Sequence, residues 1–114
     1  MGDMREVRPD PPDTRKIKYP LKRADVDMVE NTALQINAGR SDYAAGTLFG
    51  ILLTQKILGL DKSWGEEQEV ITITSYDLGM VKTILPQIGE ISAYANGTRL
   101  GILLALKIIG KEDR

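Results

Sequence analysis

The chain has 114 residues, with 15 basic and 16 acidic side chains and a net charge of −1. This length suits one compact domain, and the near-neutral charge argues against a uniformly basic nucleic-acid binder. Cysteine and histidine are absent. Disulfides, thiolate chemistry, histidine bases and the usual zinc ligands are therefore excluded, and we expect no enzyme, no metal and no cofactor.

The N-terminal segment, residues 1–14, is polar and contains three prolines. We expect it to be a disordered arm, and it shows no signal-peptide pattern. The longest apolar stretch, Leu48–Leu60, is interrupted by two polar residues and is too short to span a bilayer. These features predict a soluble cytoplasmic protein that has no membrane partner.

Residues 15–21 combine alternation with positive charge. Tyr19 and Leu21 alternate with lysines, and this period of two predicts a short strand. Pro20 has no N–H to donate, so it should lie at the end of the strand or face away from the partner strand. Residues 15–23 contain no acidic residue and five basic ones: Arg15, Lys16, Lys18, Lys22 and Arg23.

Two helices are predicted after this strand. The first is expected to be capped by Asp25 and to end near Asn37, while the second is capped by Ser41 and ends near Leu58, before a glycine. Apolar residues at three- and four-residue spacing place one face of the first helix in the core. That face consists of Val26, Val29, Ala33 and Ile36.

The second half of the chain follows the same order. Residues 60–68 are a polar linker that contains Trp64, and residues 69–74 (EVITIT) are the clearest strand in the chain. A third helix is expected to begin at a cap, either Ser75 or Asp77, and to run to about residue 88.

Two further features shape the C-terminal helices. Pro86 lies inside the third predicted helix, which it should end early or kink. The last helix is expected to be capped by Ser92, to run to Ile109 and to stop at Gly110.

The chain contains an internal repeat. Residues 41–59 (SDYAAGTLFGILLTQKILG) and 92–110 (SAYANGTRLGILLALKIIG) are identical at twelve of nineteen positions. Such similarity predicts a duplicated β-α-α unit of about fifty residues. Because a unit of this size is marginal alone, the two units, residues 15–59 and 69–110, should share one core and form one domain.

The longer helix of each unit is apolar nearly all round, which is typical of a buried central helix. Each also contains a Gly-x-x-x-Gly step, at Gly46 and Gly50 and again at Gly97 and Gly101. Glycine lowers helix propensity by about 1 kcal/mol relative to alanine. Its presence at these positions in both units predicts that two helix backbones cross closely there.

A short strand, a helix of about twelve residues, a turn and a longer apolar helix resemble the unit of the ribbon-helix-helix DNA-binding family. The resemblance covers residues 16–59 and 69–110, and the second unit, with ITITS followed by two helices, fits best. It implies a mainly α fold of the tandem, single-chain type. In that fold the two strands form one antiparallel ribbon over four interlocked helices, and the ribbon enters the major groove of double-stranded DNA.

The resemblance implies which residues of this chain lie on each face of the ribbon. Residues expected to face the helices are Ile17, Tyr19, Leu21, Ile71 and Ile73. Residues expected to face DNA are Lys16, Lys18, Lys22, Val70, Thr72 and Thr74, since lysine can bond guanine acceptors and threonine can meet base edges. The alternatives are that the lysines only protect an edge strand and that the threonines only favour strand structure.

The resemblance also implies phosphate contacts at the starts of the two longer helices. The free N–H groups near Ser41 and Ser92 would hold phosphates, with Arg40 beside the first. The alternative is that both serines are only helix caps.

The resulting functional hypothesis is a small DNA-binding regulator of transcription that reads the major groove with its ribbon. One alternative is a protein-interaction or assembly module, including a homo-oligomer, that does not bind DNA. Another is an accessory protein that bends DNA during plasmid transfer.

Overall fold

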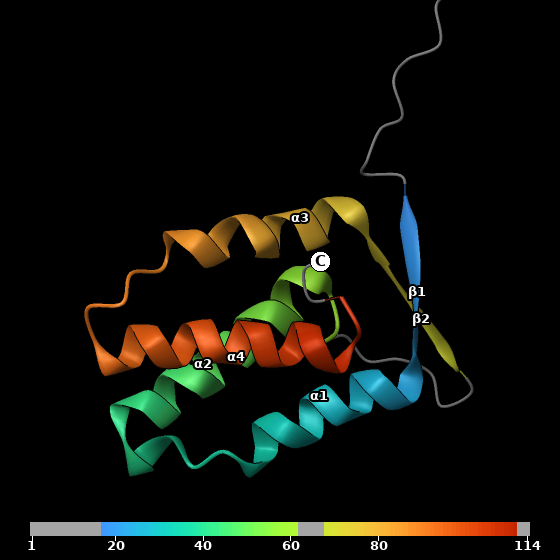
Figure 1. Ribbon diagram of the computed structural model, residues 1–114. Coiled ribbons are helices and arrows are strands. Elements are labelled where there is room, and N and C mark those ends of the chain that lie inside the picture. The colour runs from blue at the N-terminus through green and yellow to red at the C-terminus, as the bar shows by residue number, and fades with distance from the viewer. Residues whose placement is uncertain (1–16, 62–67, 112–114) are drawn as a thin grey trace, which may run out of the picture.

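The computed structural model describes residues 17–61 and 68–111, so the predicted arm, Lys16 and Trp64 lie outside the described residues. The described part is mainly helical with one two-stranded antiparallel sheet, which confirms the predicted class (Figure 1). Its elements in chain order are β1 (Lys18–Lys22), α1 (Arg23–Gln35), η2 (Ala38–Arg40), α2 (Asp42–Leu58), β2 (Val70–Thr74), α3 (Ser75–Ile84), η3 (Leu85–Gln87) and α4 (Ala93–Ile108).

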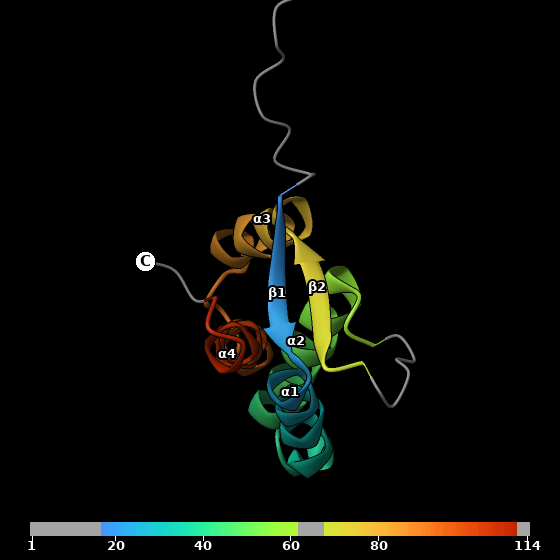
Figure 2. The same cartoon turned by 90° about the vertical axis from the view of Figure 1, so that its right-hand side faces the viewer.

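The two strands pair within the chain to form a ribbon (Figure 2). Tyr19 lies opposite Ile73, and Pro20 lies opposite Thr72 at the centre of the ribbon. Beyond the two ends, Arg23 N donates to the Glu69 oxygen at 2.9 Å and Ser75 N donates to the Ile17 oxygen at 2.8 Å.

The proline at the ribbon's centre is compatible with this pairing. Hydrogen-bonded and non-hydrogen-bonded pairs alternate along an antiparallel ladder. Because Ile17 and Ser75 are hydrogen-bonded, Pro20 and Thr72 fall at a non-hydrogen-bonded pair. The nitrogen of Pro20 therefore faces away from β2, as predicted, and its missing N–H removes no bond from the ladder.

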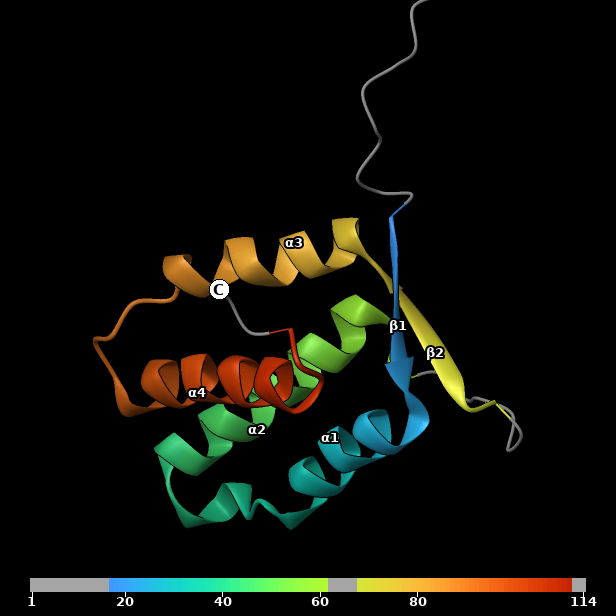
Figure 3. The ribbon, with the colours of Figure 1, turned by 45° about the vertical axis from the view of Figure 1, so that its right-hand side comes forward.

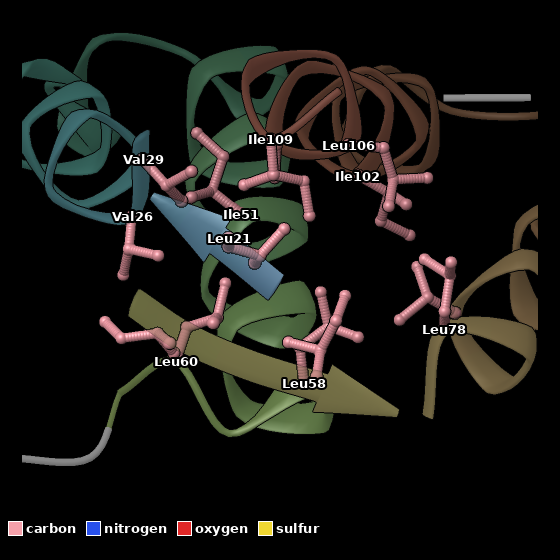
Figure 4. Close-up of a cluster of buried hydrophobic side chains, with 14 of the residues drawn as sticks. Leu21, Val26, Val29, Ile51, Leu58, Leu60, Leu78, Ile102, Leu106 and Ile109 are labelled. Atoms are coloured by element: carbon pink, nitrogen blue, oxygen red, sulfur yellow. The ribbon is translucent and has the colours of Figure 1, made fainter. Parts of the chain in front are cut away.

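The inner face of the ribbon packs on the helices (Figure 4). Leu21, Ile71 and Ile73 are buried and Tyr19 is partly buried, as the alternation predicts. Ile17, which was expected inside, is 41% exposed because β1 begins only after it. All four α-helices contribute to the same apolar cluster, and its helical members include Val26, Val29, Ile51, Leu78, Ile102 and Leu106.

The longer helices begin as predicted, with the side chain of Ser41 accepting from Ala44 N and that of Ser92 accepting from Ala95 N. The cap predicted for the first helix is wrong: α1 begins at Arg23, directly after β1, and Asp25 lies in its first turn. The ribbon bond from Arg23 N already satisfies one donor of that turn, so α1 starts without a side-chain cap.

The ends of the shorter helices also differ from expectation. Helix α1 stops at Gln35, two residues before Asn37, whose side chain accepts from Gly39 N and starts η2. Helix α3 stops at Ile84, and Pro86 lies in η3, so the proline ends this helix early. Helix α2 ends at Leu58, as predicted, and α4 ends at Ile108, one residue before the predicted Ile109. The glycines that follow these helices, Gly59 and Gly110, have left-handed backbones.

Helices α2 and α4 cross with their backbones in contact, as the glycine pattern predicts. A Cβ on Gly46 would overlap the backbone oxygen of Tyr94, and one on Gly97 would overlap that of Tyr43. Deeper in the crossing, Gly50 lies against Thr98 and Gly101 against Thr47 in the same way. Each glycine therefore makes a contact that its counterpart makes from the other helix.

The directions of the helices determine which parts of the chain lie far from the ribbon. Both α1 and α3 run away from the strands, and α2 and α4 run back toward them (Figure 3). The starts of α2 and α4 consequently lie at the end of the molecule remote from the ribbon (Figure 1). Within residues 17–61 and 68–111, no helix is long and apolar enough to cross a membrane.

Candidate nucleic-acid interface

The outer face of the ribbon presents five exposed residues, which we call the outer ribbon face. Strand β1 contributes Lys18, Pro20 and Lys22, and strand β2 contributes Val70 and Thr72. Their side chains point away from the core because the buried residues of both strands occupy the alternate positions. Four of the residues predicted to face DNA thus lie together on one exposed surface: Lys18, Lys22, Val70 and Thr72.

The positive charge of this face lies on one strand. Lys18 and Lys22 both belong to β1, about 13 Å apart at roughly 3.3 Å per residue. Strand β2 has no basic residue, and the exposed Glu69 precedes it. The electrostatic attraction for an anion is therefore strongest along the β1 edge of the ribbon.

Arg23 adds a third cation at the end of β1, but its side chain is engaged. Its Nε lies 3.3 Å from an Asp27 carboxylate oxygen, and its Nη1 donates to the Gln68 oxygen at 3.1 Å. The guanidinium thereby ties the start of α1 to the segment that leads into β2.

Thr74, which was predicted to face DNA, has a different role. Its residue is only partly exposed, and its Oγ1 accepts from Asp77 N at 3.1 Å. Thr74 therefore caps α3, where Ser75 or Asp77 was expected to do so. The strand passes directly into the helix, so the last strand residue occupies the N-cap position.

The three predicted phosphate-binding positions are exposed, but they lie away from the outer ribbon face. Arg40 and Ser41 precede α2 and Ser92 precedes α4, at the remote end of the molecule (Figure 1). Both serine hydroxyls accept from the helix they cap, at 3.0 Å. The structure thus brings Lys18, Lys22 and Thr72 together and leaves Arg40, Ser41 and Ser92 elsewhere.

Exposed apolar residues on α2 and α4 were missed by the sequence reasoning, which expected both helices to be buried and central. Leu52 on α2 is 48% exposed and Leu103 on α4 is 37% exposed. Four further residues on the same helices are comparably exposed: Tyr43, Phe49, Tyr94 and Leu100. The rings of Phe49 and Tyr94 stack across the crossing, 6.0 Å between centroids. Because α2 and α4 each cross one helix at close range, namely each other, the side of each helix that faces away from this crossing stays partly exposed. An apolar sequence does not reveal this arrangement.

A further hollow in the described part of the chain lies along α3. A depression of about 360 Å³ follows α3 and is lined mostly by Tyr76, Gly79, Met80 and Ile84. In residues 17–61 and 68–111, no group of three or more acidic side chains stands where it could hold a metal ion. The charged residues of the outer ribbon face therefore remain the best candidate site in the described chain.

Comparison with known proteins adds no assignment: no family model, no curated protein and no solved structure matches this chain.

Proposed function

We propose that this protein binds double-stranded DNA through the outer ribbon face and acts as a small transcriptional regulator with a tandem ribbon-helix-helix-like fold. The observation that carries the proposal is the exposure of Lys18, Lys22 and Thr72 on one face of a ribbon built within a single chain. A two-stranded ribbon fits the major groove, which is about 12 Å wide. Lysine ammonium groups reach guanine acceptors or phosphates, and threonine reaches base edges or a thymine methyl.

The proposed duplication behind this fold is supported by contacts that occur in equivalent pairs. The two hydrogen bonds at the ends of the ribbon occupy equivalent positions, as do the glycine contacts between α2 and α4. In each of the two longer helices a buried threonine, Thr47 or Thr98, donates to the carbonyl four residues earlier at 2.9 Å. Two similar units facing each other across one ribbon would produce this pairing.

A binding measurement with two charge-reversed variants tests the proposal. The probe is a fluorescein-labelled mixture of random duplexes of about 20 base pairs, titrated at low and moderate salt because phosphate contacts weaken as salt rises. We expect Lys18→Glu to weaken binding at least about ten-fold while the free energy of unfolding changes by less than about 0.5 kcal/mol.

The matched control is Arg40→Glu, which makes the same change in net charge at the remote end of the molecule. It should alter the affinity by less than about two-fold, because charges beyond a Debye length of about 10 Å are largely screened. An equal loss of DNA affinity in both variants would show that the binding site is not the outer ribbon face. The absence of any DNA binding by the unaltered chain would end the proposal.

A second candidate function, assembly with another copy of this chain, is favoured by the exposed apolar residues of α2 and α4. Leu52 and Leu103 occupy the same position in the two aligned repeats, and both are exposed. Exposed apolar surface that gathers into patches marks interaction sites more often than chance. Sedimentation velocity on the unaltered chain and on the double variant Leu52→Gln, Leu103→Gln tests this function. An oligomer that the double variant converts to monomer supports it, and a monomer at every concentration contradicts it.

A further inference from the structure

The outer ribbon face is chemically asymmetric even though the ribbon itself is geometrically regular. A two-fold rotation about its central pair, Pro20 and Thr72, exchanges the strands of an antiparallel ribbon. This rotation carries Lys18 onto the position of Val70 and Lys22 onto the position of Thr74. No outward position is occupied by the same residue after the exchange.

The exchanged residues favour different bases. Lysine donates to the O6 and N7 acceptors of guanine, whereas a valine side chain offers only apolar contact, which suits the methyl group of thymine. Thr72 presents a hydroxyl and a methyl group where Pro20 presents no donor. Thr74 is committed to capping α3, so it does not replace the donor that Lys22 supplies.

Charge reinforces the same difference. Strand β1 carries both lysines, one at each end, and attracts the negatively charged DNA, whereas the exposed Glu69 beside β2 opposes it. A duplex whose major groove holds the ribbon would therefore be bound more tightly along β1 than along β2. Reversing the duplex would place the guanine acceptors against Val70, where no donor meets them.

We infer that the protein recognises a non-palindromic DNA site in one orientation, with a guanine against Lys18 at one end of the ribbon and an A·T pair against Val70 at the equivalent position of the other end. This inference rests on the proposed DNA binding. A single chain already supplies both strands of the ribbon, so one molecule fills the groove and nothing requires the site to be symmetric. Specificity for one orientation comes from the three pairs of exchanged positions. The two residues of each pair differ, so they favour different base pairs in the two halves of the site.

Repeated selection from random duplexes by the unaltered chain tests the inference. We expect the enriched sequences to lack two-fold symmetry, with guanine at the position that meets Lys18 and an A·T pair at the equivalent position of the other half, which meets Val70. Duplexes made palindromic from either half should bind at least about five-fold more weakly, since one mismatched base pair typically costs this much or more.

The variant Val70→Lys makes the two exchanged positions alike. Selection with this variant should move one A·T pair of the second half to G·C and make the consensus more symmetric. Lys18→Val also makes these two positions alike, but here the guanine preference in the first half should be lost. Circular dichroism of both variants confirms that the fold is kept.

The outcomes separate this inference from the proposed function. A palindromic consensus for the unaltered chain, or binding that enriches no sequence, would overturn the inference and leave DNA binding in place. A consensus that Val70→Lys does not change would overturn it as well. Failure of the unaltered chain to bind any duplex in the pool would overturn the proposed function itself, and this inference with it.

Discussion

The α2/α4 crossing and the outer ribbon face treat the two halves of the chain in opposite ways. At the crossing, the four glycines make contacts that are equivalent when the helices are exchanged. On the ribbon, the exchange replaces Lys18 by Val70 and Pro20 by Thr72.

The difference teaches where this chain tolerates change. At the crossing, two backbones touch, and no side chain larger than hydrogen fits between them. On the outer ribbon face the side chains project into solvent, so packing places no demand on their identity. The unlike residues on that face are therefore free to serve binding, whereas the like residues at the crossing serve the fold.

The largest predicted effect comes from filling the crossing. Gly50→Ala and Gly101→Ala each place a methyl group against the partner backbone, which must move apart. We expect each variant to lower the free energy of unfolding by about 2–4 kcal/mol, measured by urea denaturation, with similar losses for the two.

The control is Gly79→Ala in α3, where the added Cβ would meet no other described part of the chain within 4 Å, beyond the neighbouring backbone of its own helix. Here alanine should raise stability by up to about 1 kcal/mol, because it favours the helix. Losses that differ widely between Gly50→Ala and Gly101→Ala would break the equivalence of the two halves at the crossing.

Removal of the two serine caps should have a smaller effect, again similar in both halves. Ser41 and Ser92 each accept one helix N–H at 3.0 Å. We expect Ser41→Ala and Ser92→Ala each to cost about 1 kcal/mol in thermal or urea unfolding. Neither variant should change DNA affinity, since both serines lie away from the ribbon (Figure 1). A loss of DNA affinity without a loss of stability would show that the two serines contact phosphate groups, as first predicted.

The smallest effect should come from the acid that borders β2. Glu69→Gln removes one negative charge beside the outer ribbon face, and we expect DNA to bind about two- to five-fold more tightly at low salt. The gain should fade as salt rises. The control, Glu90→Gln, removes a charge that lies 3.7 Å from Arg99, ahead of α4 at the remote end. A gain of the same size in this control would mean that net charge, not the ribbon, sets the affinity.

Several features of the fold could be predicted because their causes are local. The alternation of residues 70–74 identifies a strand, and the serines and glycines that bound α2 and α4 are caps whose chemistry acts within one helical turn. The glycine spacing likewise predicted the crossing, since both members of the contact repeat the same pattern.

Other features depend on tertiary structure and were missed. The starts of α1 and α3 are set by the ribbon, which bonds Arg23 N and Ser75 N, and not by the aspartates downstream. The direction of α1 and α3 carries Ser41 and Ser92 away from the ribbon, and no local pattern records that direction (Figure 3). The exposure of Leu52 and Leu103 depends on how many other elements pack around each helix, and this number cannot be predicted from an apolar sequence.

The central claim is that DNA meets this protein at the outer ribbon face. Amide chemical shifts of the ¹⁵N-labelled protein, recorded during titration with an unlabelled duplex, test it most directly. We expect the amides of residues 18, 19, 21, 22 and 70–74 to shift, while the amides that follow Ser41 and Ser92 do not. Shifts confined to the starts of α2 and α4, or no shifts at all, would contradict it.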